Sequence, residues 1–356
     1  AEMSERQVQP TSVTLGCMVD ALVTNHHAGD AWELVQAAWE DKEQQALVNN
    51  VIYSTILKGF AMTRQHDRVS ELYEEMKKRG IQPNSITYNT VLNSLARSGL
   101  VHRAGELLEE MRAAEVAPDL VTYSTIIKGY CQVGDLDRSL ELLKEMREEA
   151  NISPDEVTYN SLLDGCARQH RLDDALRLLD EMRGAGVAPS NYTLSIVSKL
   201  LGRSRRLQQA LTMVESISEE YGFRPNIQVY TCLMQACFHN RQLEKALELH
   251  DKMVGEGLLP DERTYTVLVR GLLQAGNTGK AEKVLRCALH LPGHGLLQPS
   301  GKLAGVDASC PSEVLSALGR GSAAARALEA ELASARGPPG RQAEGCQRRS
   351  QRWPAN

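Results

Sequence analysis

The sequence predicts an all-α protein, an α-solenoid built from stacked two-helix repeats. The prediction depends on three residue types that recur with one shared period of 35 to 36 residues. The tyrosines are Tyr53, Tyr88, Tyr123, Tyr159, Tyr230 and Tyr265; the prolines are Pro83, Pro118, Pro154, Pro189, Pro225 and Pro260; the methionines are Met76, Met111, Met146, Met182 and Met253. A repeat of this length is typical of a stacked array, in which each unit buries its apolar surface against its neighbours.

The pattern inside one period predicts two helices. Between Leu120 and Asp155, a first run at helical spacing ends at Gly134, and a second apolar stripe extends from Leu136 to Met146. Gly134 suits a helix end because glycine adopts the left-handed conformation readily. The Pro-Asp pair closes the unit, since proline cannot continue a helix and Asp155 can cap the next one.

The period divides the chain into units. Six repeats are expected at 50–84, 85–119, 120–155, 156–190, 191–226 and 227–261, with a partial last repeat at 262–289. Residues 12–49 are interpreted as a degenerate repeat. Residues 1–11 are interpreted as the tail of a preceding repeat, as expected for a fragment of a longer solenoid. Residues 290–356 are expected to be a low-complexity, mostly disordered tail, in which an Ala-rich piece at 322–336 can form a helix.

Composition excludes several classes of function. No stretch approaches 18 consecutive apolar residues, so we expect no membrane partner. The eight cysteines form no Cys-x-x-Cys pair and no Cys/His cluster with zinc spacing, which indicates free thiols and neither metal nor cofactor. Deaminase, nuclease and phosphate-loop motifs are missing from the sequence, so the chain is not expected to be an enzyme or to take a small-molecule substrate.

The motifs resemble a known repeat family. They are Thr87-Tyr88-Asn89-Thr90, Thr122-Tyr123-Ser124-Thr125 and Thr158-Tyr159-Asn160-Ser161, each followed by a Glu-Met pair and a proline close. These motifs resemble the pentatricopeptide repeat in its plain 35-residue variety, over about residues 1–289. The tetratricopeptide repeat has a period of 34 and a Trp and Leu-Gly signature that does not occur here in register. The resemblance implies a right-handed solenoid whose first helices line a concave face and bind single-stranded RNA, one base per repeat.

The resemblance also implies which side chains read the bases. They are the residue after each tyrosine, or after Leu194 where the tyrosine is missing, and the final residue of the repeat. The pairs are Ser54 with Asn84, Asn89 with Asp119, Ser124 with Asp155, Asn160 with Ser190, Ser195 with Asn226, and Thr231 with Asp261. All twelve side chains can form hydrogen bonds with a base edge. In the family's code these pairs correspond to A, U, G, C, A and G, from 5′ to 3′. The alternative interpretation is that the final residues are ordinary helix N-caps and the first members face solvent.

A third implied element is a side chain that stacks between successive bases. Candidates are Val51, Ile86, Val121, Val157 and Tyr192, of which the tyrosine offers a π-face. Gln228 and Arg263 depart from this pattern, so stacking near the C-terminal end is in doubt.

Charge separates the two kinds of helix. The chain has a net charge of −5 and residues 1–289 one of −8, yet the first thirteen residues of the seven units from 50 onward carry +5. Four basic residues recur at one place: Lys58, Lys128, Lys199 and Arg270. A positive stripe on the first helices favours contact with a phosphate backbone. The alternative is that the second helices are simply solvated and acidic.

The expected function is therefore RNA binding that supports organellar RNA processing, stability or translation. The family resemblance implies a mitochondrial or plastid location and possible protein partners in RNA processing. Two alternatives stay open: a peptide-binding scaffold that uses the same groove, and a recruiting subunit of a ribosome or nuclease.

Overall fold

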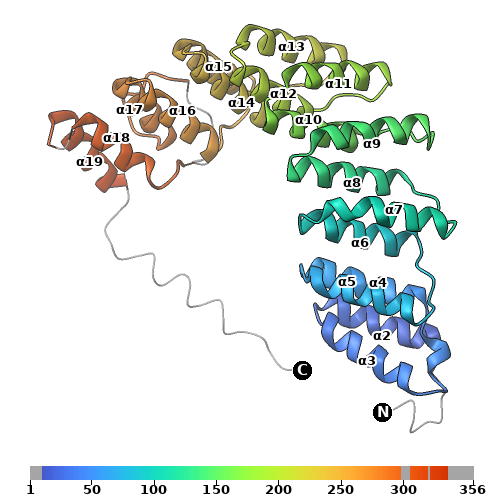
Figure 1. Cartoon of the computed structure of the whole chain (residues 1–356). Coiled ribbons are helices and arrows are strands. Elements are labelled where there is room, and N and C mark those ends of the chain that lie inside the picture. Colours follow the sequence, from blue (N-terminus) through green and yellow to red (C-terminus); the bar gives the residue numbers. More distant parts are fainter. Residues whose placement is uncertain (1–9, 298–304, 320, 336–356) are drawn as a thin grey trace. The chain divides into compact units, whose positions relative to one another are not determined.

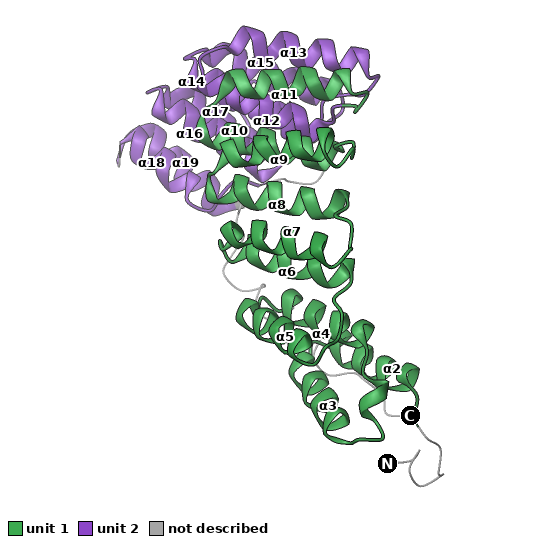
Figure 2. Cartoon of the chain, turned by 45° about the vertical axis from the view of Figure 1, so that its right-hand side comes forward, with its two compact units in different colours: residues 1–188 green, residues 189–356 purple. Residues whose placement is uncertain are grey.

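The computed structural model describes residues 10–297, 305–319 and 321–335, and in these ranges the chain consists of α-helices and two short 3-10 helices (Figure 1). Strands are absent from this described part. Most of the segment expected at 1–11, and residues 336–356 of the tail, lie outside the described residues. The chain divides into two compact units, residues 1–188 and 189–356 (Figure 2).

Unit 1 contains five helical pairs, counted over its described residues. Its first helices are α2 (Ser12–Thr24), α4 (Asn50–Met62), α6 (Ser85–Arg97), α8 (Leu120–Val133) and α10 (Glu156–Gln169). Its second helices are α3 (Ala28–Glu40), α5 (His66–Lys78), α7 (Ala104–Ala113), α9 (Leu136–Glu148) and α11 (Leu172–Gly184). The 3-10 helices η1 (Gln45–Leu47) and η2 (Val101–Arg103) lie in the connections. Each first helix packs against its own second helix, and α2, α4, α6 and α8 each pack against the next first helix.

Unit 2 continues the same plan. Its first helices are α12 (Asn191–Arg203), α14 (Ile227–His239) and α16 (Glu262–Gln274), and its second helices are α13 (Leu207–Glu220), α15 (Leu243–Gly255) and α17 (Thr278–Ala288). Two further helices follow, α18 (Cys310–Leu318) and α19 (Ala323–Ala335). The all-α fold of stacked two-helix repeats predicted from the sequence is confirmed in both units.

The residues predicted to end and begin helices do so. Gly134 ends α8 with φ of 89°, a left-handed conformation that glycine adopts without steric cost. Asp155 then caps α10, because its Oδ1 atom accepts a hydrogen bond of 2.8 Å from the Thr158 amide. The first helix of each repeat therefore starts at a fixed residue, which sets the register of its faces.

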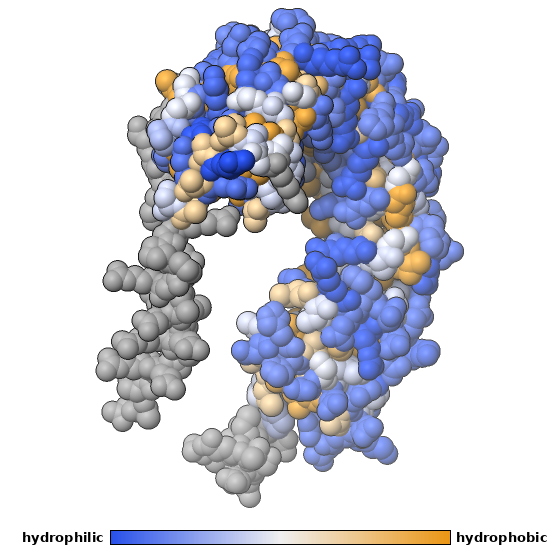
Figure 3. Space-filling view, turned by 90° about the vertical axis from the view of Figure 1, so that its left-hand side faces the viewer, coloured by the Kyte–Doolittle hydropathy of each residue, from blue (hydrophilic) through white to orange (hydrophobic). Residues whose placement is uncertain are grey.

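The periodic tyrosines and methionines form the core. All six tyrosines are at most 2% exposed and all five methionines are fully buried. Leu15 fills the tyrosine place in the degenerate repeat and is 6% exposed. On the face drawn in Figure 3, hydrophobic residues form small separate spots on a mostly hydrophilic surface. Such a surface fits a chain that buries its apolar stripes between stacked helices.

Close helix approach depends on glycine at particular places. A Cβ atom on Gly129 of α8 would lie 2.8 Å from the Ala96 Cβ of α6, and one on Gly202 of α12 would lie 2.8 Å from the Ala236 Cα of α14. These distances are shorter than van der Waals contact, so only glycine lets the first helices pack this closely.

The tail differs from its sequence-based expectation. The Ala-rich piece forms α19 as anticipated, but the interpretation of 290–356 as mostly disordered is wrong for α18. This nine-residue helix packs against α16 and α17 and buries Cys310 and Val314 completely. The low-complexity composition of the tail did not reveal the short apolar stripe of α18, which covers the end of the last repeat.

Two further observations concern cysteines and membranes. Seven of the eight cysteines lie in the described ranges; all seven are free thiols, and six of them are buried. Among the helices that the structure describes, none has both the length and the apolarity needed to cross a bilayer.

Candidate nucleic-acid interface

The second residue of the first helices from α4 to α12 projects an apolar side chain into solvent, whereas α14 and α16 have Gln228 and Arg263 at this place. The expected stacking residues Val51, Ile86, Val121, Val157 and Tyr192 are between 56% and 61% exposed. Apolar side chains left exposed at the same place in successive repeats form a regular row of contact points that folding does not explain.

The sequence analysis missed one member of this row. Val13 is the second residue of α2 and is 71% exposed. The signal was present, because Leu15 marks the tyrosine place and Val13 lies two residues before it. The row therefore starts in the degenerate repeat.

Two of the predicted reading pairs are in direct contact. The Ser54 hydroxyl donates a hydrogen bond of 3.3 Å to Oδ1 of Asn84. The Asn89 Nδ2 atom donates one of 3.3 Å to Oδ1 of Asp119. The stacking of successive repeats thus brings together side chains that lie 30 residues apart in the sequence.

Two other pairs are joined through a threonine. The Ser124 and Thr158 hydroxyls lie 2.8 Å apart, and Thr158 donates a hydrogen bond of 2.7 Å to Asp155. Thr231 contacts Thr264 at 2.8 Å, and Thr264 donates one of 2.7 Å to Asp261. This buried threonine, the third residue of the next first helix, was missed by the sequence analysis. The Thr-Tyr runs contained the signal.

The Ser195 and Asn226 side chains use other partners. Ser195 donates to the Asn191 carbonyl oxygen, and Asn226 accepts from the Val229 amide. Valine stands here in place of the bridging threonine, so the hydroxyl that joins the other pairs is missing.

The remaining pair is divided between the two units. Asn160 lies in unit 1, where its Nδ2 atom donates a hydrogen bond of 3.1 Å to Glu156. Ser190 lies in unit 2, where its hydroxyl accepts one of 3.1 Å from the Tyr192 amide.

The final residues of the repeats also cap helices. All six act as N-caps of the following first helix, which confirms that part of the alternative interpretation. Four of the six first members do not face solvent as that interpretation required, because Ser54, Asn160, Ser195 and Thr231 are buried, and the other two, Asn89 and Ser124, are half-buried. Capping therefore explains one member of each pair and leaves the other unexplained.

Each capping aspartate uses only one of its two carboxylate oxygens. At Asp119, Asp155 and Asp261, the capping bonds all end on Oδ1. Burial raises the pKa of Asp119, but hydrogen bonds from Thr122 and Asn89 outweigh it, so this pKa is lowered from its ordinary value. The carboxylate stays ionised at neutral pH and keeps a second oxygen for an external donor.

Three of the four predicted phosphate contacts project from the first helices. Lys58 and Lys128 are exposed and Lys199 is half-buried. Within the described residues, no carboxylate forms an ion pair with any of them. These ammonium groups remain available to an anionic ligand.

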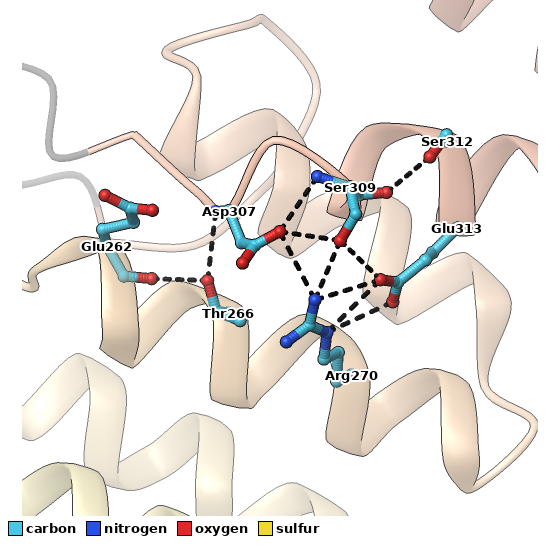
Figure 4. Close-up of polar contacts among 7 residues, drawn as sticks. All are labelled: Glu262, Thr266, Arg270, Asp307, Ser309, Ser312 and Glu313. Carbon is cyan, nitrogen blue, oxygen red and sulfur yellow. Dashed lines mark hydrogen bonds and ion pairs between the residues drawn. The ribbon is translucent and has the colours of Figure 1, made fainter.

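Arg270 does not share this arrangement, and its expected exposure to phosphate is wrong. Its guanidinium lies 3.1 Å from Glu313 and 3.4 Å from Asp307, both in the segment that contains α18 (Figure 4). The sequence analysis missed this because the tail had been interpreted as disordered.

Acidic residues of the second helices pair with neighbouring second helices in unit 1. The ion pairs are Lys77 with Glu110 (2.9 Å), Arg112 with Glu145, and Arg147 with Glu181. These glutamates are thus neutralised between second helices, away from the first-helix lysines. The charge separation expected from the sequence has a structural basis here.

One cavity in unit 1 collects all three kinds of predicted side chain. It has a volume of about 620 Å³, and its lining includes Val121, Val157, Ser124, Asp155 and Lys128. The two apolar residues come from successive first helices, α8 and α10. Across the residues that the structure describes, no group of three or more His, Cys, Asp or Glu side chains is arranged to hold a metal ion.

The fold and this face define an α-solenoid of 35-residue repeats with a polar and basic first-helix surface. The chain belongs to the PPR repeat family, whose model matches residues 48–97, 84–132, 118–168, 154–203 and 225–274; a PPR repeat model also matches 263–289. The family resemblance noted in the sequence is therefore confirmed.

Individual relatives match parts of the chain. The pentatricopeptide repeat-containing protein At5g18475 of Arabidopsis thaliana is 29% identical over 101 residues, which is 28% of this chain and 20% of that protein. The chloroplastic protein At5g48730 of the same plant is 30% identical over 80 residues, 22% of this chain and 16% of its own length. The chain thus spans about a fifth of these relatives.

The fold is also similar to a solved structure. The pentatricopeptide repeat protein PPR10 from maize, in complex with an 18-nt psaJ RNA element, is 22% identical with a TM-score of 0.54. The match covers 94% of this chain and 55% of PPR10. At this identity the likeness establishes the shared solenoid architecture.

Proposed function

We propose that the chain binds single-stranded RNA along the face formed by its first helices, one base per repeat. The observation that carries the proposal is the cavity lined by Val121, Val157, Ser124, Asp155 and Lys128. It combines two apolar surfaces, a pair of hydrogen-bonding groups and a cation around one space. A nucleotide needs these three features for its ring faces, its base edge and its phosphate.

Each side chain then has a distinct task. Val121 and Val157 contact the two faces of one base. The Asp155 Oδ2 atom accepts a hydrogen bond from the base edge, since Oδ1 is used by Thr158. The Lys128 ammonium neutralises an adjacent phosphate. The six reading pairs of units 50–84 to 227–261 then specify the string A, U, G, C, A, G, from 5′ to 3′.

The degenerate repeat adds an unselective position at the 5′ end. Val13 and Val51 supply apolar surfaces, but Gly16 stands at the reading place and has no side chain. Asp20 occupies the place that Lys58 holds in the next repeat. We expect this unit to accept any base and to contribute little affinity.

The relatives support a role in organelles. Two Arabidopsis relatives are named as mitochondrial and one as chloroplastic, and PPR10 was solved with a bound RNA. We infer that the chain acts in a mitochondrion or plastid, where its RNA binding supports processing, stability or translation. The function requires binding alone.

The test is an exchange of one reading pair. Asn89→Ser with Asp119→Asn should move the preference at the second base from U to A and leave the other five unchanged. Each base contact contributes about 1 kcal/mol, so a single mismatch changes affinity by about fivefold. Asp173→Asn, an exposed position on the second helix α11, is the matched control for the lost charge.

Two outcomes contradict the proposal in different ways. If the double variant loses affinity equally for all four bases, these side chains are caps only and the code does not apply. If the wild-type chain shows no salt-dependent RNA affinity, the first-helix face belongs to a protein-interaction scaffold instead.

A further inference from the structure

The end of the solenoid is closed by polar contacts between α16 and the segment that leads into α18. Arg270 is the ninth residue of α16, the place that Lys58, Lys128 and Lys199 occupy in their first helices. Its guanidinium donates hydrogen bonds to the Ser309 hydroxyl at 2.8 Å and to Glu313 at 3.1 to 3.4 Å, as Figure 4 shows.

Asp307 contacts a second functional position of α16, the reading place. Its backbone N–H donates a hydrogen bond of 3.1 Å to the hydroxyl of Thr266. Thr266 follows Tyr265, so it stands at the reading place of the last repeat. The Asp307 carboxylate lies 3.4 Å from Arg270 and accepts from both the amide and the hydroxyl of Ser309. One segment thus engages the reading and the phosphate places together.

The helix α18 lacks the side chains with which the first helices are proposed to contact a nucleotide. Pro311, the second residue of α18, is buried, whereas Val51 and its counterparts are exposed. The sequence of α18 contains no lysine or arginine. The helix α18 therefore continues neither the apolar row nor the cation of the first-helix face.

We propose that residues 305–318 form an acidic cap that ends the RNA-binding face. In this cap, Asp307 and Glu313 occupy the position beside the Arg270 guanidinium that an RNA phosphate would otherwise take. The inference rests on the proposed RNA-binding function. A carboxylate matches a phosphate in charge sign and in its geometry toward a guanidinium, so the two compete for one site. The cap fixes the 3′ boundary of the bound RNA at the base of unit 227–261.

Apolar contacts hold the cap in place independently of its charged side chains. Cys310 and Val314 are fully buried, so apolar contacts with α16 and α17 hold α18 in place. The hydrogen bond from Arg270 lowers the pKa of Glu313, and hydrogen bonds from Ser309 lower that of Asp307. Both carboxylates therefore remain charged at neutral pH.

The test removes the charges and keeps the shape. Asp307→Asn with Glu313→Gln in the full chain retains hydrogen-bonding oxygens at both places. Binding is measured to an RNA of the six proposed bases and to the same RNA extended by two nucleotides at its 3′ end. Glu244→Gln with Glu248→Gln on the second helix α15 changes the net charge equally and is the matched control.

The expected result depends on RNA length. Wild type and control should bind both RNAs with equal affinity. The cap variant should bind the extended RNA about tenfold more tightly than the short one, because one charged hydrogen-bonding group is released. Its salt slope should steepen by about 0.7 for one added phosphate. Adding Arg270→Gln to the cap variant should abolish both gains.

Other outcomes overturn the inference. A cap variant that binds both RNAs as wild type does, or a control that gains as much, shows that the acidic residues are structural only. If the wild type binds RNA but the cap variant shows no effect of RNA length, the cap proposal fails and the proposed RNA-binding function is not contradicted. Absence of RNA binding by every protein removes both proposals.

Discussion

The lysines of the first helices give a quantitative prediction about salt. Lys58, Lys128 and Lys199 are each the ninth residue of a first helix, and no carboxylate in the described residues pairs with them. Each is expected to neutralise one phosphate and to release the counterions condensed on it. The perturbation is Lys128→Ala, which removes one such contact without touching a reading pair.

The magnitude follows from the number of contacts. On a single strand each phosphate contributes about −0.7 to the slope of log affinity against log salt, so three lysines predict a slope of about −2. Lys128→Ala should reduce it to about −1.4. Between about 50 and 200 mM salt, wild type should lose about 20-fold in affinity and the variant about sevenfold.

The assay is a salt titration of binding to an RNA that carries the proposed string. Lys144→Ala is the matched control, because Lys144 is exposed on the second helix α9 and its loss changes the net charge equally. The control should keep the wild-type slope. Base preference should stay the same in both variants, since lysine contacts the backbone and not the base edge.

Two results would refute this reasoning. A slope that stays near −2 in Lys128→Ala means that the first-helix lysines do not face the RNA. An equal reduction in Lys144→Ala means that the affinity depends on overall charge, and the assignment of RNA to the first-helix face fails.

Two further predictions concern stability. Gly202→Ala should destabilise the chain by about 1 to 2 kcal/mol despite the better helix propensity of alanine, because its Cβ would lie 2.4 Å from the Ala236 Cβ. Gly105→Ala, with nothing within 4 Å, should leave stability equal or higher, and thermal unfolding that ranks the two the other way contradicts the close packing. His250 is fully buried beside Asp251, and burial lowers its pKa despite that neighbour, so stability should fall as pH drops below the unfolded value of about 6.5, by up to about 1.4 kcal/mol per pH unit. His250→Leu should flatten this part of the pH dependence in denaturant unfolding, and an unchanged profile would show that the histidine is not its source.

Sequence reasoning predicted the repeats well because each one is local. The period, the glycine at the end of α8 and the cap at Asp155 follow from residues within one unit, and the structure places all of them as expected. The places of the exposed apolar residues from Val51 to Tyr192 follow from the same register. Val13 was missed only because its repeat lacks the marker tyrosine.

The end of the solenoid could not be predicted in the same way. Arg270 looks like Lys58 when only the period is considered, but its partners Asp307 and Glu313 come from a segment with no repeat pattern. An ion pair between residues about 40 positions apart, one of which lies outside the repeat pattern, leaves no periodic trace in the sequence. The bridging threonines are a different case, since their spacing was visible but their contact with the preceding repeat required three dimensions.

The capping role and the proposed reading role of the final residues explain each other. A residue at this place must start the next helix, and Asp, Asn and Ser do so well whereas apolar residues do not. The same three residues differ at the atom beyond the cap: Asp offers a charged acceptor, Asn an amide that also donates, and Ser a short hydroxyl. The threonine at the third helix position fixes the geometry of the cap. The Thr122 hydroxyl, for example, accepts a hydrogen bond from the Asp119 amide, and the Thr122 amide donates one to Oδ1 of Asp119. A solenoid built in this way can exchange one final residue for another without losing the helix start, so the base preference can change while the scaffold stays the same.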